Sequence, residues 1–141
     1  MSKQYWLMKS EPDAYPWEQL VKDGTGIWDG VRNHTAKLNM MAMKVGDEAF
    51  FYHSNIGKEC VGIMTITEES FLDPTAEKGS PWVVVRVAPV RALANPVTLA
   101  AIKADPKLAD MDLIRQSRLS VGRVTPDEWK HILKKSETPG G

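Results

Sequence analysis

The sequence is poor in several features, and each shortage excludes a class of protein. Cys60 is the single cysteine in 141 residues, so an internal disulfide is impossible. No stretch approaches the ~20 consecutive apolar residues that span a bilayer, and the first residues do not resemble a signal peptide. We therefore expect a cytoplasmic protein with a reduced thiol and no membrane partner.

Patterns that mark common metal and catalytic sites are also missing. His34, His53 and His131 include no pair at HxxxH spacing, and one cysteine gives no CxxC pair. We therefore expect no metal site and no cofactor. Neither a glycine-rich phosphate loop nor a GxSxG elbow is present. Cys60 lies in an apolar strand pattern, which predicts a buried, unreactive thiol.

The net charge is zero, which argues against a protein that coats nucleic acid through bulk electrostatics. The charge is unevenly distributed, however, because residues 11–29 carry a net charge of −4 and residues 113–135 a net charge of +4. Such asymmetry permits a local anion-binding face. Solvated faces without any partner are the alternative.

Short strand and helix patterns follow one another without strict β-α-β alternation, which predicts an α+β domain with a mostly antiparallel, curled sheet. Pro89 indicates that its strand ends, or reaches a sheet edge, at that point. An apolar fraction of 43% suits one domain, expected over residues 1–135, with a disordered tail at 136–141. Strands are predicted at 4–9, 48–52, 60–67, 82–90 and 119–124, and helices at 16–24, 33–43, 98–102 and 125–135.

The segment from Trp28 to Asn33 says most about function. An indole, the Arg32 guanidinium and the Asn33 carboxamide lie within six residues, outside any convincing helix or strand pattern. These groups can stack on a planar ring, hold an anion and bind polar ring edges. Structural alternatives remain open, with Trp28 as a partly buried anchor and Asn33 as a helix cap.

Lys9, Ser10 and Glu11 are the sharpest catalytic candidates, because an amine, a hydroxyl and a carboxylate leave a strand end together. A buried carboxylate with a raised pKa could activate a water molecule. The alternative is a surface turn with local hydrogen bonds. His53 and Ser54 make a poor nucleophile–base pair, because adjacent strand residues point to opposite faces.

Six runs in a fixed order carry a resemblance to a known family. They are Tyr5–Pro12, Gly30–Asn33, Val45–Asp47, Phe51–Ser54, Asp73–Thr75 and Arg115–Val121. The chain resembles an EVE domain, of the kind found in the thymocyte nuclear protein family and its bacterial relatives, over nearly its whole length. The resemblance implies a PUA-like fold, which is a bent pseudo-barrel of mostly antiparallel strands surrounded by short helices.

The same resemblance implies a binding function. PUA-like domains of this kind hold a single modified base, extruded from a nucleic acid strand, in an aromatic-lined pocket. EVE domains are associated with modified DNA bases, such as modified cytosines, and with modified RNA bases. We therefore expect a binding module whose partner is DNA or RNA carrying a modified base, with a modified cytosine as the first candidate.

The predicted site residues fall into two groups. Base contacts are expected from Ser10, Trp28, Asn33, His53, Ser54, Ser117, Leu119 and Ser120, and phosphate contacts from Lys9, Arg32 and Arg118. His53 as a core histidine, and Ser117 and Ser120 as turn residues, are the structural alternatives.

Two other functions remain open. The related ASCH domains include enzymes that hydrolyse acylated cytidine with a lysine, a hydroxyl residue and a glutamate, and residues 9–11 supply the same side-chain types, although consecutively. A domain that recruits a protein partner is the third possibility. The sequence leaves the base, the choice between DNA and RNA, and the oligomeric state open.

Overall fold

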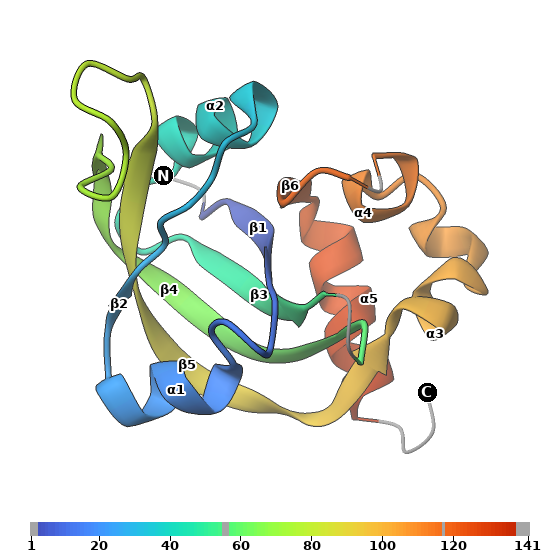
Figure 1. Ribbon diagram of the computed structural model, residues 1–141. Helices are drawn as coiled ribbons and strands as arrows, with labels where there is room; N and C mark the ends of the chain where they lie inside the picture. The colour runs from blue at the N-terminus through green and yellow to red at the C-terminus, as the bar shows by residue number, and fades with distance from the viewer. Residues whose placement is uncertain (1–2, 55–56, 117, 138–141) are drawn as a thin grey trace.

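The computed structural model describes residues 3–54, 57–116 and 118–137 (Figure 1). In these residues the chain forms one six-stranded sheet in the order β2-β5-β4-β3-β1-β6. The strands are β1 (Tyr5–Ser10), β2 (Gly26–Ile27), β3 (Glu48–His53), β4 (Glu59–Leu72), β5 (Val83–Thr98) and β6 (Val121–Val124). The helices are α1 (Trp17–Asp23), α2 (His34–Ala42), α3 (Leu99–Lys103), the 3-10 turn η1 (Pro106–Leu108), α4 (Asp112–Arg115) and α5 (Pro126–Ser136).

The sheet is mixed but mostly antiparallel. Strands β1 and β3 pair in parallel, and the other neighbouring strands pair antiparallel. The α+β class and the curled sheet are confirmed. The sheet does not close, because β2 and β6 remain its two edges.

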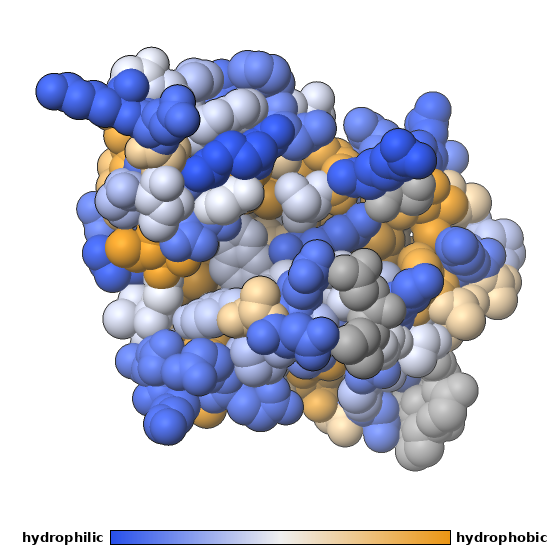
Figure 2. Space-filling view, viewed as in Figure 1, coloured by the Kyte–Doolittle hydropathy of each residue, from blue (hydrophilic) through white to orange (hydrophobic). Residues whose placement is uncertain are grey.

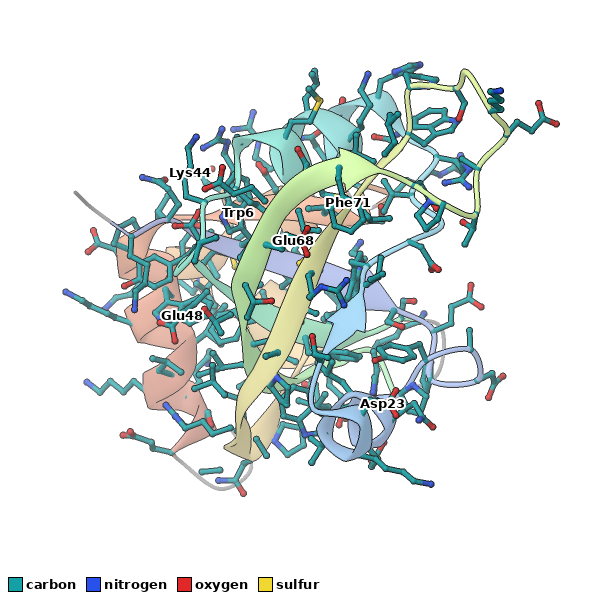
Figure 3. All side chains as sticks on the ribbon, turned by 90° about the vertical axis from the view of Figure 1, so that its left-hand side faces the viewer. Trp6, Asp23, Lys44, Glu48, Glu68 and Phe71 are labelled. Atoms are coloured by element: carbon teal, nitrogen blue, oxygen red, sulfur yellow. The ribbon has the colours of Figure 1, made fainter. Side chains whose placement is uncertain are left out.

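Strand β5 is longer than the sequence pattern predicted. It passes through Pro89 and continues to Thr98, and its register against β4 shifts where Met64 pairs with Pro89. Proline is tolerated there because β2 pairs with β5 only at Arg86 and Val87, so the missing N–H faces an unpaired edge. Figure 3 shows this long β4–β5 ribbon from the side, with Glu68 on β4.

The sheet separates two hydrophobic cores, because successive strand residues point to opposite faces. Trp6 and Met8 of β1 and Phe51 of β3 join the core covered by α1 and α2, whereas Leu7 and Phe50 join the core covered by α5. We call these sides the α2 face and the α5 face; Figure 1 shows α2 and α5 on different sides of β1. Each large buried side chain contributes about 1.5–3 kcal/mol. Cys60 is fully buried in the second core, as predicted, and burial raises the pKa of its thiol.

Helix α2 packs one stripe of small and flexible apolar residues against the sheet. Ala36 and Met40 pack into the core, while Leu38 and Met41 are exposed. The start of the helix is as expected, because Asn33 Oδ1 accepts from the backbone N–H of Ala36 at 2.9 Å.

Helix α5 begins where it was predicted to begin, and its first turn is closed by a capping box. Thr125 Oγ1 accepts from the backbone N–H of Glu128, whose carboxylate accepts from the Thr125 N–H. The disordered tail was predicted to begin at residue 136, but Ser136 is the last residue of this helix. Ser136 is buried, and its carbonyl accepts from Asn95 Nδ2 at 2.7 Å. Residues 138–141 of the predicted tail lie outside the described residues. No helix in the described ranges is long and apolar enough to cross a membrane.

Candidate nucleic-acid interface

The end of strand β1 brings together segments that are far apart in the sequence. The Ser10 carbonyl accepts from the backbone N–H of Ser54, which follows β3, at 2.9 Å. The Lys9 N–H donates to the carbonyl of Ser120, just before β6, at 2.9 Å. Three of the runs that carried the resemblance therefore meet at the end of β1, which lies between β3 and β6 in the sheet.

A cavity of about 630 Å³ opens beside this strand end, and we call it the aromatic cavity. Its walls come from β1, the β1–α1 loop, the end of α1 and the segment around β2. The lining residues are Lys9, Ser10, Glu11, Ala14, Tyr15, Asp23, Gly26, Ile27, Trp28, Asp29 and Gly30. The cavity is large enough for a planar heterocycle.

Trp28 is both a core anchor and a wall of the aromatic cavity. Its backbone N–H donates to the carbonyl of Val85 at 2.9 Å, and its ring meets Phe51 and Tyr15 edge-on, at interplanar angles of 83° and 88°. Only 6% of the residue surface is exposed. Little of Trp28 is therefore open to a ligand, and the residue lines the cavity. The structural alternative and the ring-binding hypothesis are compatible at this residue.

The polar groups of the aromatic cavity have defined roles. Ser10 Oγ donates to the carbonyl of Tyr15 at 2.7 Å, so its remaining capacity is to accept a hydrogen bond. Tyr15 Oη is buried and has no hydrogen-bond partner among the described residues. Burial raises the pKa of Tyr15, with Asp23 and Asp29 acting in the same direction, so the phenol stays protonated.

The aromatic cavity is acidic. Among the described residues that line it, Glu11, Asp23 and Asp29 carry carboxylates and Lys9 carries the one ammonium group. Figure 3 labels Asp23, the last residue of α1. These carboxylates come from the acidic stretch at 11–29, of which only Glu11 was predicted to have a role, as a catalytic candidate. Such walls favour a ligand that donates hydrogen bonds and disfavour a phosphate.

Asp73 holds the Trp28–Asn33 segment from the outside. Its carboxylate accepts from the Gly30 N–H at 3.1 Å, from Arg32 Nη1 at 3.0 Å, and from the Thr75 N–H and hydroxyl at 2.7 and 2.6 Å. Burial raises the pKa of Asp73, but the hydrogen bonds from Thr75, Arg32 and Gly30 outweigh it and lower the pKa to about 2. Arg32 was predicted to contact phosphate. In the structure its Nη1 forms an ion pair with Asp73 instead.

A second cavity, of about 340 Å³, lies at the start of α2 and is called here the arginine cavity. It is lined by Asn33, Thr35, Arg115, Gln116, Arg118 and Leu119. In Figure 2 hydrophobic residues show in the recess between α2 and α4, beneath a hydrophilic rim. Because Asn33 Oδ1 caps α2, the amide group of Asn33 is left to donate, which suits an anion better than a base edge. Ser117 lies outside the described residues.

A third cavity, of about 490 Å³, is called the lysine cavity. Its lining residues are Lys9, Tyr52, Ser54, Lys58, Leu99, Lys103, Leu113 and Ile114. Tyr52, Leu113 and the residues beneath them belong to the core of the α5 face, whereas Trp28 belongs to that of the α2 face. Lys9 lines both this cavity and the aromatic cavity.

The predicted site residues thus divide among three neighbouring cavities rather than one. Trp28 and Ser10 line the first, Arg118 and Leu119 the second, and Ser54 the third. Their roles in binding stay predictions. The cavities were not predicted separately, because no local pattern links residues that only the fold brings together.

Comparison with known proteins places the chain in a family. Residues 4–135 match the EVE domain. This chain belongs to the EVE domain family. It is 36% identical to mouse thymocyte nuclear protein 1, over 95% of this chain and 74% of the mouse protein.

Solved EVE-domain relatives share the fold along almost the whole chain. A Rhodopseudomonas palustris protein, whose structure was determined by NMR, is 51% identical, with a TM-score of 0.89, over 98% of this chain and 96% of that one. The human THYN1 protein, crystallised in complex with DNA containing 5-methylcytosine, is 32% identical, with a TM-score of 0.87, over 96% of this chain and 99% of that one.

Two of the runs that carry the EVE resemblance have structural roles. Asp47 is buried at the other end of the sheet, where it accepts from Trp6 Nε1 at 3.2 Å and from the Gln4 and Lys44 N–H groups. Asp73 anchors the Trp28 segment as described above. Both carboxylates satisfy backbone donors that would otherwise be unpaired.

His53 also has a structural role in this EVE domain. Its Nε2 accepts from the backbone N–H of Trp17 at 3.1 Å, and its ring meets Phe51 edge-on. The interpretation as a core histidine accounts for both contacts. His53 does not line any of the three cavities described above.

Proposed function

We propose that this EVE domain binds a modified base of DNA, extruded from its strand into the aromatic cavity, and performs no chemistry on it. The observation that carries the proposal is a cavity walled by Trp28 in a domain whose human relative was crystallised with 5-methylcytosine-containing DNA. A cytosine carrying a modification is the first candidate ligand, and RNA is a second source of such bases.

Stacking on Trp28 supplies the affinity for the ring. Base–aromatic stacking contributes about 1–3 kcal/mol. Because Trp28 is almost wholly buried and lines a cavity, a base must leave the helical stack to touch it. A modified base that is already unstacked, or lies in a single strand, should bind with less cost than one in an intact duplex.

The acceptors in the cavity favour a base with an exocyclic amino group. Ser10 accepts, and the carboxylates of Asp23 and Asp29 accept, so the amino group of cytosine or adenine has partners. The carbonyl oxygens of thymine or uracil would face the same groups unfavourably. One methyl group adds only about 1–3 kcal/mol of discrimination, so the preference for a methylated base over the plain base should be modest.

The hydrolase alternative has weaker support in the geometry. The Ser10 hydroxyl is engaged with the Tyr15 carbonyl, and Lys9 Nζ lies 5.9 Å from the centre of the Tyr52 ring. A nucleophile needs a base within hydrogen-bonding reach, and the partner of Ser10 Oγ among the described residues is a backbone carbonyl rather than a base. The comparison of residues 9–11 with the catalytic residues of ASCH enzymes therefore rests on residue types alone.

The test is a binding titration with matched variants. Short labelled oligonucleotides, as DNA and as RNA, carry 5-methylcytosine, 5-hydroxymethylcytosine, N6-methyladenine or no modification. Trp28→Leu should weaken binding of the preferred modified strand about 10- to 100-fold. Trp17→Leu is the control, because Trp17 packs against Phe51 in the same core but does not line the cavity. It should change affinity less than about threefold.

Two results would overturn the proposal. One is equal affinity of the folded Trp28→Leu and Trp17→Leu proteins for every strand. The other is release of acetate from N4-acetylcytidine that is lost in Glu11→Gln and retained in Trp28→Leu, which would establish the hydrolase instead. Circular dichroism of both tryptophan variants checks that they remain folded.

A further inference from the structure

The lysine cavity lies beside the aromatic cavity but on the other face of the sheet. Lys9 and Ser10 are consecutive on β1 and therefore project to opposite sides of the strand. Ser10 lines the aromatic cavity with Trp28, and Lys9 reaches the lysine cavity, where its ammonium lies over the ring of Tyr52. We propose that the lysine cavity holds the sugar-phosphate backbone next to the base bound in the aromatic cavity; this rests on the proposed function.

The charges of the two cavities differ in sign. Of the described residues that line the lysine cavity, three are lysines and none is acidic, whereas three carboxylates line the aromatic cavity. A phosphodiester would be repelled by the carboxylates and attracted by the ammonium groups. An extruded nucleotide carries both a base and a phosphate, and these two groups need opposite electrostatic environments. The two cavities are neighbours, because Lys9 lines both.

The lysine cavity is built rather than a chance grouping of exposed lysines. Lys58 adopts a left-handed backbone conformation, with φ of 45°, which a residue with a side chain seldom takes. Its carbonyl accepts from the N–H of Leu99, at the start of α3, at 2.8 Å. Helix α3 also carries Lys103, so this contact holds two of the three lysine-bearing segments against each other.

The shape of the cavity suits a sugar as well as a phosphate. Leu99, Leu113 and Ile114 give it apolar walls, against which a deoxyribose can pack. A further hollow of about 420 Å³ shares Lys58, Leu99 and Lys103 with it and extends past the start of α3. The two together provide room for the backbone on one side of the bound base.

The experiment compares two double variants that remove the same charge. Lys58→Gln with Lys103→Gln changes the cavity, and Lys107→Gln with Lys130→Gln changes two exposed lysines outside it. Affinity is measured against salt concentration for a DNA strand with 5-methylcytosine, the same unmodified strand, and the free 5-methyldeoxycytidine nucleoside. Lys9 is left intact because it lines both cavities.

We expect the double substitution in the lysine cavity to lower the affinity for both DNA strands by the same factor, about tenfold at low salt. The slope of log affinity against log salt should fall by about 1 to 2, since one or two phosphate contacts are lost. The nucleoside, which has no phosphate, should bind the variant and the parent alike. The control variant should leave the slope unchanged.

Equal affinities and slopes for the cavity and control variants would overturn the inference. So would a loss of nucleoside affinity in the cavity variant, because it would mean that the lysines act on the base. Failure of the proposed function has a different signature, in which the parent protein fails to distinguish the two strands while the salt slopes are still measurable.

Discussion

The two cavities at the end of β1 differ in almost every chemical property, although they share Lys9. The one on the α2 face has an indole wall and three carboxylates, and the one on the α5 face has three lysines and aliphatic walls. Lys9, which lines both cavities, and Ser10, which lines the first and not the second, are consecutive residues of β1. The difference shows how a protein with zero net charge can offer a nucleotide two opposed environments.

Trp28→Ala is the substitution with the largest expected effect on the difference between the two faces. Removing a buried indole from the core of the α2 face should destabilise the protein by about 3–5 kcal/mol, measured by chemical denaturation. The core of the α5 face does not contain Trp28, so its packing should be retained in any molecules that fold. A loss of less than about 1 kcal/mol would mean that Trp28 is not the anchor of its face.

Low pH should lower the stability of the fold on the α2 face, because the Asp73 carboxylate becomes protonated. The pKa of Asp73 in the folded protein is about 2, below its ordinary value of 3.8, so the ionised form stabilises the fold. That contribution, about 2 kcal/mol, is fully present above roughly pH 5 and is lost as the pH falls towards 2. Asp73→Asn should flatten this part of the pH–stability curve, whereas Asp110→Asn, at an exposed position, should not.

Gly26→Ala should disturb the aromatic cavity without touching the lysine cavity. A Cβ at position 26 would lie 2.5 Å from Tyr15 Oη, so the tyrosine must move. We expect a cost of about 1–2 kcal/mol and a several-fold loss of affinity for the modified strand. Combining Gly26→Ala with Tyr15→Phe should recover stability relative to Gly26→Ala alone; a purely additive double variant would show that the two sites do not interact.

The smallest expected effect is that of Ser10→Ala. It removes one hydrogen bond, to the Tyr15 carbonyl, and one acceptor in the aromatic cavity, at a cost of about 1 kcal/mol. The preference for strands bearing an amino base over those bearing a keto base should narrow about fivefold, while the salt slope stays that of the parent. A change in the slope of log affinity against log salt would mean that Ser10 acts on phosphate binding rather than on the base.

Local signals in the sequence predicted much of the fold. The helix start at Thr125, the cap at Asn33 and the strand after Trp82 each depend on neighbouring residues, and all three appear in the structure. The extension of β5 beyond Pro89 could not be predicted in this way, because it depends on where the short strand β2 stops pairing. Helix α4 and strand β2 are too short to leave a periodic pattern.

For the candidate site, the sequence by itself determined the chemical groups and the family, since the runs around Lys9, Trp28 and Asp73 are contiguous. Only the tertiary structure decided how those groups are used. It committed Arg32 to Asp73, and it brought Lys58 and Lys103 to the neighbourhood of Lys9. The physical reason is that a cavity and an ion pair form between segments distant along the chain, so their partners are chosen by sheet pairing and the direction of each side chain.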